Sequence, residues 1–175
     1  MNKLLSLILT VLVICACNSK KNEYDPYKIN GVEKKIETKN SFEVKFKKTD
    51  SNLKTIHVKL NNTGHDVIFD TGCSGVSIST LELNELTKEN TLSKDDYRGT
   101  IPVQIADGTV NEIPQFNINK ITIVDINGKE HTLSNIVATV EENPAAQILI
   151  GSSVIDNFAK KSYTVDLSKK VIRFE

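Results

Sequence analysis

The sequence predicts a mainly β protein that forms a small closed or partly open β-barrel with one or two short helices. From Ser41 onward, apolar and polar residues alternate in short runs, as expected for half-buried strands. Turn sequences such as Asp107-Gly108 and Asn127-Gly128 separate these runs. The 175 residues suffice for one modest domain with its own core.

Composition narrows the classes of partner. The 22 basic and 22 acidic residues balance, so no strong net charge attracts nucleic acid, and no nucleic-acid partner is expected. Cys15 and Cys17 lie in the N-terminal leader, which leaves Cys73 and argues against an internal disulfide framework. The three histidines lack the spacing of metal ligands, so neither a metal nor a cofactor is expected.

The first residues have the pattern of a targeting segment. Lys3 precedes an apolar run over 4–16, which predicts a signal peptide over 1–16 that is too short for a comfortable membrane span. The run ends in Ile14-Cys15-Ala16-Cys17, which resembles the lipobox of bacterial lipoproteins. That resemblance implies cleavage before Cys17 and lipidation of its thiol. The alternative is a plain signal peptide or a membrane anchor in which Cys17 has no such role.

Residues 17–40 are rich in Lys, Asn, Glu and Ser, which predicts a lipidated flexible tether before a folded domain over 41–175. Asn18 follows Cys17, where an Asp would resemble an inner-membrane retention signal. The lipoprotein resemblance therefore implies a bacterial cell-envelope protein that is anchored to the outer membrane by its N-terminal lipid. The domain would then face the periplasm or the cell surface.

The expected elements follow in order along the domain. Alternating apolar residues predict strands over 42–46 and 56–60, and the continuous apolar run Val67-Ile68-Phe69 predicts a strand buried on both faces. Another strand begins at 76–78, and a helix is predicted over 81–92. The later part predicts a 101–113 hairpin, strands over 116–123, 136–140 and 147–150, a helix capped by Ser152 or Ser153 that runs through Phe158, and a final 163–174 hairpin.

Asp70-Thr71-Gly72 directly follows the apolar run 67–69, and it is the motif in this sequence whose side chains are suited to a chemical reaction. The apolar strand fixes the base of a tight loop, and Asp70 projects at its mouth. Thr71 offers a hydroxyl that can tie the loop to a neighbour. Gly72 permits close backbone approach and leaves its amide free to donate to the carboxylate.

This segment resembles the active-site loop of the retropepsin-like (clan AA) aspartic proteases, and the chain is identified as a bacterial lipoprotein member of that family. The 101–113 hairpin resembles the family's flap, and Ile148-Leu149-Ile150-Gly151 resembles the strand beneath the catalytic loop. The resemblance covers about 42–175 and implies a retropepsin-like acid-protease barrel. The resemblance implies that Asp70 is catalytic and that Thr71 and Gly72 complete the active-site loop. It implies substrate binding at the tip of the flap, by Ala106, Asp107 and Gly108. Ile150 and Gly151 would support the loop from below.

The resemblance implies an aspartic endopeptidase that hydrolyses extended peptide or protein substrates through an Asp-activated water. Two carboxylates at close range share one proton, so that one acts as base and the other as acid. The chain holds no second Asp-Thr-Gly or Asp-Ser-Gly. The family's solution is a homodimer in which each subunit contributes its Asp70.

Two other functions are open from the sequence. Gly72-Cys73-Ser74-Gly75 faintly resembles a serine-hydrolase nucleophile turn, but Val76 breaks the pattern. The same fold is also compatible with a catalytically inactive binding or assembly module, in which Asp70 only holds its loop together. Cys73 replaces the family's usual Ala or Ser, and is either a small buried apolar residue or an oxidisable thiol.

Overall fold

The structure is a computed structural model that describes residues 41–105 and 107–175. The predicted signal peptide, the tether with Cys17, and Ala106 lie outside the described residues. Within the described part, no helix is long and apolar enough to cross a membrane.

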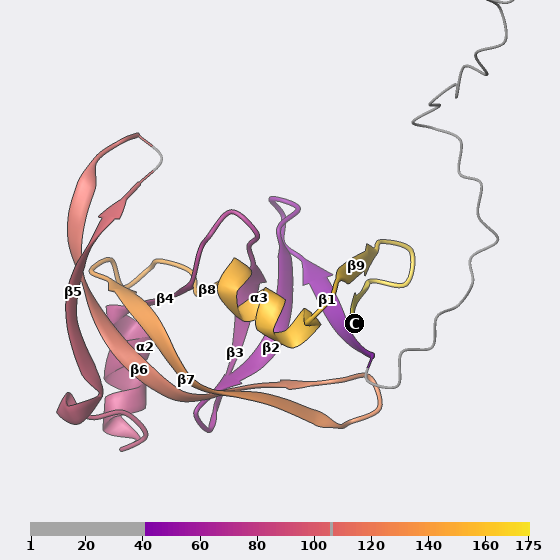
Figure 1. The fold of residues 1–175 in the computed structure, drawn as a ribbon, viewed down its shortest axis with the longest axis horizontal. Coiled ribbons are helices and arrows are strands. Elements are labelled where there is room, and N and C mark those ends of the chain that lie inside the picture. Colours follow the sequence, from indigo (N-terminus) through magenta and orange to yellow (C-terminus); the bar gives the residue numbers. More distant parts are fainter. Residues whose placement is uncertain (1–40, 106) are drawn as a thin grey trace, which may run out of the picture. The chain divides into compact units, whose positions relative to one another are not determined.

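Ten strands and two α-helices make up the described chain (Figure 1). The first half contains β1 (Phe42–Lys48), β2 (Lys54–Leu60), β3 (Thr63–Phe69), β4 (Val76–Ser79), α2 (Thr80–Lys88) and the 3-10 turn η2 (Lys94–Asp96). The second half contains β5 (Tyr97–Gln104), β6 (Val110–Val124), β7 (Glu130–Glu141), β8 (Leu149–Ile150), α3 (Ser152–Ala159), β9 (Tyr163–Asp166) and β10 (Val171–Phe174).

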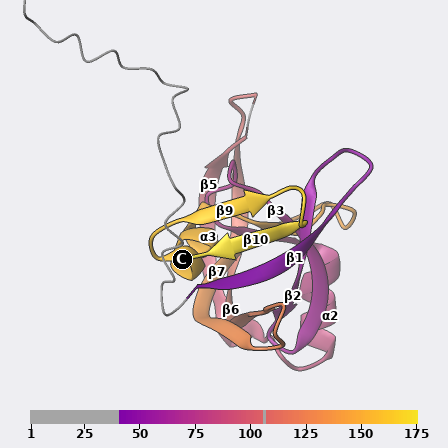
Figure 2. The ribbon, with the colours of Figure 1, turned by 90° about the vertical axis from the view of Figure 1, so that its right-hand side faces the viewer.

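The strand pairings close into a barrel. Neighbouring strands run β6-β7-β4-β8-β3-β2, and β2 also pairs with β6, where Leu60 lies opposite Ile121. β1 pairs with β2 through its second half and with β10 through its first half, and β10 carries β9 (Figure 2). The prediction of a small, mainly β barrel is therefore confirmed.

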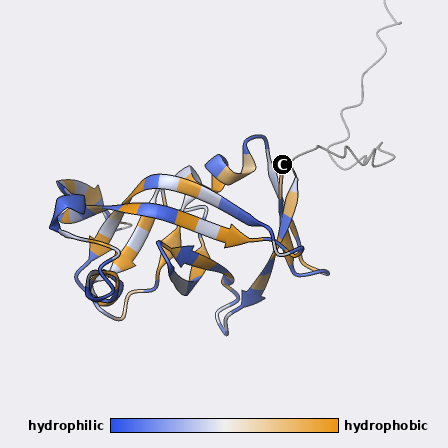
Figure 3. Ribbon diagram, turned by 90° about the horizontal axis from the view of Figure 1, so that it is seen from below, coloured by the Kyte–Doolittle hydropathy of each residue, from blue (hydrophilic) through white to orange (hydrophobic). Residues whose placement is uncertain are grey.

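The alternation seen in the sequence places one side of each strand in the core. Figure 3 shows this as alternating apolar and polar bands along the strands. Leu60 and Ile121, at the closing pair, are completely buried. The buried cluster extends from Phe42 to Phe174, and the described residues belong to one compact unit. The described domain consequently has its own core.

The first helix is shorter than the sequence predicted. It begins at Thr80 after a capping box formed by Ser79 and Glu82, and it ends at Lys88 rather than at 92. Asn90 adopts a positive φ of 57°, which cannot continue a right-handed helix. Leu92 nevertheless reaches the core, because the chain folds back and the Leu92 amide donates to the Leu86 carbonyl.

The strands after the flap are longer than predicted. β6 is a single strand of 15 residues that pairs first with β5 and later with β2, while β7 follows it over most of its length. β7 begins at Glu130, well before the 136–140 segment predicted from apolar spacing. The first part of β7, over 130–137, contains no fully buried residue, so its apolar pattern is weak in the sequence.

The β6–β7 turn is organised around the buried Asp125. Its Oδ1 accepts hydrogen bonds from the amides of Asn127 (2.8 Å) and Lys129 (2.9 Å). Its Oδ2 accepts one from Nε2 of His131 (3.1 Å), whose ring stacks on Phe42 with 3.6 Å between centroids. Burial raises the pKa of Asp125, but the hydrogen bonds from His131, Lys129 and Asn127 outweigh burial and hold the pKa below its ordinary value of 3.8.

Asp125 is therefore expected to stabilise the fold in a pH-dependent way. A lowered folded-state pKa contributes stability that is present above the unfolded value, near pH 4, and is lost as the pH falls through the folded value. The free energy of unfolding should exceed that of Asp125→Asn at pH 7, and the difference should shrink as the pH is lowered below 4. Urea unfolding of both proteins across this range measures the effect, and a difference that stays constant with pH would contradict it.

Candidate active site

Asp70 lies at the end of the most deeply buried part of β3. Val67, Ile68 and Phe69 are all buried, as the apolar run predicted. The Asp70 amide donates to the carbonyl of Ile150 on the parallel strand β8 at 3.0 Å. The backbone of Asp70 is thus bonded to the barrel sheet, while the residue itself is only half-buried, at the beginning of the loop.

The loop holds one oxygen of this carboxylate in place. The Gly72 amide donates to Oδ1 of Asp70 at 2.8 Å, and the Cys73 amide lies 3.3 Å from the Asp70 carbonyl. The Thr71 hydroxyl makes no hydrogen bond to any described residue, and the Thr71 carbonyl instead accepts one from the Ser152 hydroxyl at 3.0 Å. Oδ2 of Asp70 has no hydrogen-bond partner among the described residues.

The start of α3 is capped by the same loop. The N-cap residue is Gly151, and no side chain caps the helix, so the prediction that Ser152 or Ser153 does so is wrong. Three consecutive amides donate to three loop carbonyls: Gly151 to Gly75 (2.7 Å), Ser152 to Cys73 (2.8 Å) and Ser153 to Ser74 (3.1 Å). These bonds satisfy amides that a helix start leaves unpaired, and they join the loop to the helix.

Gly151 permits this contact because it has no side chain. A Cβ at this position would lie 2.3 Å from the Cys73 carbonyl oxygen and 2.4 Å from the Gly75 carbonyl oxygen. The loop could not approach the helix start with any other residue there. Ile150 and Gly151 therefore support the loop through their backbone atoms.

The β5–β6 hairpin projects from the barrel as the predicted flap (Figure 1). At its tip, the Ile105 amide donates to Thr109 (2.9 Å), and the amide of Gly108, which has a positive φ of 89°, donates to Ile105 (2.9 Å). Ile101 lies opposite Ile113, which is buried. The hairpin therefore has an apolar face at its base and glycine at its turn.

The carboxylate of Asp107 stabilises its own turn at the tip of the hairpin. Its Oδ1 accepts the Thr109 amide at 2.8 Å, and this hydrogen bond lowers the pKa of Asp107. Asp166 likewise closes its own turn by accepting the amides of Ser168 and Lys169. Among the described residues, no other carboxylate is hydrogen-bonded to the Asp70 loop. Within the part of the chain that the structure describes, Asp70 is thus the carboxylate that this loop holds.

Cys73 is half-buried and unpaired in the described part of the chain. Its Sγ lies 3.4 Å from the Gly75 carbonyl, and its own carbonyl caps α3. The residue therefore serves the loop through its backbone. Within the described residues, no group of three or more potential ligands is placed to hold a metal ion.

Comparisons with known proteins place this domain among related folds. Residues 56–157 match the family model described as gag-polyprotein putative aspartyl protease. A retropepsin-like aspartic protease from Rickettsia conorii superposes with a TM-score of 0.52 at 20% identity, covering 77% of this chain and 90% of that one. The EIAV protease complexed with the inhibitor HBY-793 gives a TM-score of 0.43 at 15% identity, covering 63% of this chain and 92% of that one. No curated protein matches the chain.

The matched segment spans more than half of the chain and includes the Asp70 loop, the flap and the Gly151 contact. The fold agrees with that of the Rickettsia enzyme. The chain therefore belongs to the gag-polyprotein putative aspartyl protease family and has its retropepsin-like fold.

Proposed function

We propose that this protein is an aspartic endopeptidase whose active site forms when two copies bring their Asp70 carboxylates together. The observation that supports this proposal most directly is the position of Asp70 on a loop that is hydrogen-bonded to β8 and α3. One oxygen of its carboxylate is also held by a hydrogen bond from the Gly72 amide. Rigid support of this kind is what a catalytic group requires, because small displacements reduce catalysis strongly.

Two copies are needed because the reaction requires a base and an acid. Two adjacent carboxylates cannot both ionise, so the pair holds one proton. A two-fold axis beside the Asp70 loop brings the two equal groups together. The pair titrates as a unit, and neither copy has a fixed role.

The chemistry then follows from the shared proton. The ionised carboxylate removes a proton from a water molecule, and the oxygen of that water attacks the carbonyl carbon of the peptide bond. The protonated carboxyl group donates to the carbonyl oxygen, which gives a tetrahedral diol. Transfer of a proton to the amide nitrogen breaks the C–N bond and releases an amine and a carboxylic acid.

The flap supplies a surface for an extended peptide. Ile101, Val103 and Ile113 alternate onto one face of the β5–β6 hairpin, and Ile105 continues this row to the tip. An extended substrate between flap and loop places alternate side chains on this apolar face and uses its backbone for hydrogen bonds. Peptide or protein substrates fit this arrangement.

The location of the enzyme belongs to the same proposal. Cys17 is lipidated and the domain is held at the outer membrane of a bacterial envelope, which the motif Ile14-Cys15-Ala16-Cys17 supports. Intact-mass measurement of the membrane-extracted protein tests this. A diacylglyceryl mass increase that disappears in Cys17→Ser is expected, and an unmodified Cys17 would contradict it.

Mixing wild type with Asp70→Asn tests the shared active site. Mixed dimers contain one carboxylate, so an excess of the variant should reduce peptide cleavage by the wild-type protein. With equal amounts and free exchange, activity per wild-type chain falls to about half. If the cleavage activity per wild-type chain stays unchanged after subunit exchange, and sedimentation shows a monomer, then one chain acts alone.

An inactive binding module is the second candidate. The Gly72 hydrogen bond to Oδ1 is also what a purely structural carboxylate would make. If the protein is such a module, the wild type should cleave no peptide of a diverse library at any pH. Asp70→Ala would then affect stability alone.

A further inference from the structure

One row of cross-strand neighbours joins β3 to β6, the strand that also forms part of the flap. Ile68 of β3 lies beside Leu149 of β8, which lies opposite Ser77 of β4. Ser77 in turn lies beside Thr139 of β7, and Thr139 lies opposite Gln115 of β6. Residues in register on neighbouring strands share one face of a sheet. The five side chains therefore lie on one face that extends from β3 to β6.

This face is on the opposite side of the sheet from the barrel core. Residues that alternate with the row along their strands, such as Val76, Ala138 and Ile150, belong to the main buried cluster. Ile68 is buried outside that cluster. Asp70 follows Ile68 by two positions and its amide still bonds to β8, so its side chain continues the same face. The row therefore lies beside the proposed catalytic carboxylate.

β6 extends this face into the flap, as its course from the hairpin into the barrel shows (Figure 1). Ile113 precedes Gln115 by two positions on β6, and it lies opposite Ile101 of β5. Ile113 is only 5% exposed, yet it too is buried outside the main cluster. The apolar face of the flap and the row are consequently parts of one continuous surface.

The middle of this surface is polar, and its hydrogen-bonding groups are free. We call Ser77, Thr139 and Gln115 the polar row. Ser77 is 6% exposed and Gln115 is half-buried, yet neither side chain forms a hydrogen bond with any described residue. The Thr139 hydroxyl is already used, because it donates to the Val76 carbonyl at 3.2 Å. An apolar ligand would cover two polar groups without replacing their water, which costs affinity, so the polar row favours a ligand that forms hydrogen bonds.

The polar row contains no charged side chain, which favours an uncharged ligand group. Glu141 follows Thr139 by two positions and therefore lies on the same face. Because β4 and β7 run antiparallel to β8, Glu141 lies on the side of the row away from Asp70. A carboxamide or a hydroxyl group thus matches the polar row better than an ammonium group or a carboxylate does.

The spacing of the strands places the polar row within reach of a substrate at Asp70. Ser77 is two strands away from Ile68, and neighbouring strands are about 4.8 Å apart. Asp70 lies two residues, or about 6.6 Å, further along β3, so its Cα atom is about 12 Å from that of Ser77. An extended peptide rises about 3.4 Å per residue. The polar row can therefore contact a substrate side chain within about three residues of the scissile bond.

We propose that Ser77 and Gln115 select substrates with an uncharged hydrogen-bonding side chain, a carboxamide or a hydroxyl, within three residues of the scissile bond. The inference rests on the proposed endopeptidase function and adds the class of substrate to it. Leu149 and the flap residues Ile101 and Ile113 lie at the two ends of the polar row and contact the neighbouring apolar parts of the substrate. Because a two-fold dimer presents the polar row twice, the preference exists on both sides of the scissile bond.

Pairs of peptides that differ at one position test this selection. Thr and Val have nearly the same shape, as do Asn and Leu, so each pair isolates the hydrogen bond. At one position on each side of the scissile bond, wild type should cleave the Thr or Asn peptide with about 10-fold higher kcat/KM than its Val or Leu counterpart. In Ser77→Ala/Gln115→Met the ratio should fall to about 1. Both peptides meet the same protein, so a lower folded fraction leaves the ratio unchanged.

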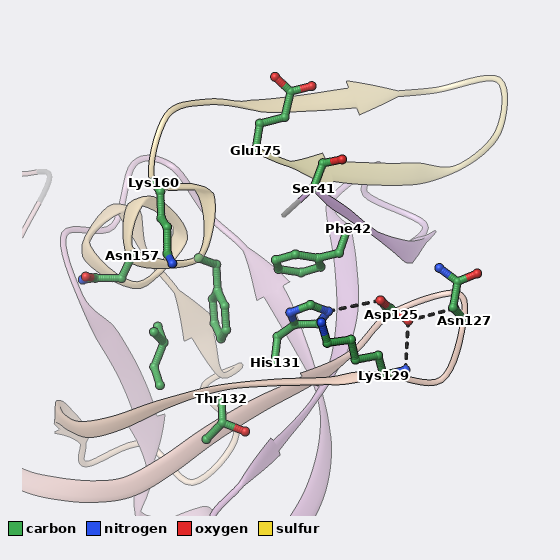
Figure 4. Close-up of a pocket in the computed structure, with 12 residues that line it drawn as sticks. Ser41, Phe42, Asp125, Asn127, Lys129, His131, Thr132, Asn157, Lys160 and Glu175 are labelled. Carbon is green, nitrogen blue, oxygen red and sulfur yellow. Dashed lines mark hydrogen bonds and ion pairs between the residues drawn. The ribbon is translucent and has the colours of Figure 1, made fainter. Parts of the chain in front are cut away.

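The matched control is Ser134→Ala, which deletes a hydroxyl group from β7 at another place. Ser134 is exposed and forms no hydrogen bond with any described residue. It follows Thr132 by two positions, and Thr132 lines a cavity at the β6–β7 turn (Figure 4). No residue of the polar row lines that cavity. Ser134→Ala should therefore keep the wild-type ratio.

Binding by Asp70→Asn separates this inference from the protease assignment. The variant keeps the polar row, and fluorescence anisotropy with labelled peptides gives the same ratios as affinities, without cleavage. A 10-fold preference in binding without cleavage by wild type would refute the endopeptidase and leave the polar row as a surface that selects peptides.

Four results would overturn the inference. They are equal affinities within the pairs, a preference for Val and Leu, a preference for Lys or Arg, which would assign selection to Glu141, and a wild-type ratio in the double variant. Cleavage by wild type together with any of these results leaves the endopeptidase intact and removes Ser77 and Gln115 from selection. A protein that neither binds nor cleaves any peptide would contradict both proposals.

Discussion

Asp70→Asn is expected to lower kcat/KM for peptide hydrolysis by at least about 10³-fold, since general acid and base catalysis contributes on the order of 10²–10⁴-fold and the substitution disables both. An amide can neither take the proton of the attacking water nor carry the shared proton of the pair. Its oxygen can still accept the Gly72 amide that Oδ1 accepts at 2.8 Å. The loop should therefore keep its shape while activity is lost.

The control for this substitution is Asp156→Asn. Asp156 lies on the exposed side of α3, and its side chain makes no hydrogen bond among the described residues, so the same chemical change should leave cleavage intact. Urea unfolding of all three proteins reports whether the fold survives. Retention of more than a tenth of wild-type activity by Asp70→Asn would remove Asp70 from the catalytic role, as would a loss that merely parallels unfolding.

Local signals in the sequence were sufficient for much of the fold. Val67–Phe69 is buried because a continuous apolar run has no polar face to expose, and the Gly108 turn closes a hairpin where the sequence places Asp-Gly. The closure of the barrel, by contrast, could not be predicted from local signals. Leu60 and Ile121 are distant in the chain, and each would be equally apolar in an open sheet, so no local pattern identifies them as partners.

The candidate site likewise contains some contacts that the local sequence predicts and others that it does not. Asp70 and Gly72 are adjacent, and their hydrogen bond follows from the loop sequence itself. Ser152 and Ser153 satisfy the local rule for a helix cap, yet the cap comes from carbonyls of the Asp70 loop, far away in the chain. The contact between Asp125 and His131 has no local signal either, because the two residues lie on either side of a turn and become partners only when the hairpin forms.

Gly151→Ala is expected to destabilise the domain by about 3 kcal/mol or more, the upper part of the range for overpacking a tight contact. The added Cβ would lie 2.3 Å from the Cys73 carbonyl oxygen and 2.4 Å from that of Gly75. Both atoms belong to backbone and cannot rotate away. The loop and the start of α3 must separate, which breaks the hydrogen bonds that join them.

Gly75→Ala is the matched control, because it makes the same change in the same loop. A Cβ at Gly75 meets nothing within 4 Å, so the free energy of unfolding should change by less than about 1 kcal/mol. Cleavage by Gly151→Ala should fall further than its folded fraction accounts for, because the Asp70 loop loses its support on α3. Equal unfolding midpoints for the two variants would show that the loop yields at little cost, and rigid support of Asp70 could then not be the basis of its reactivity.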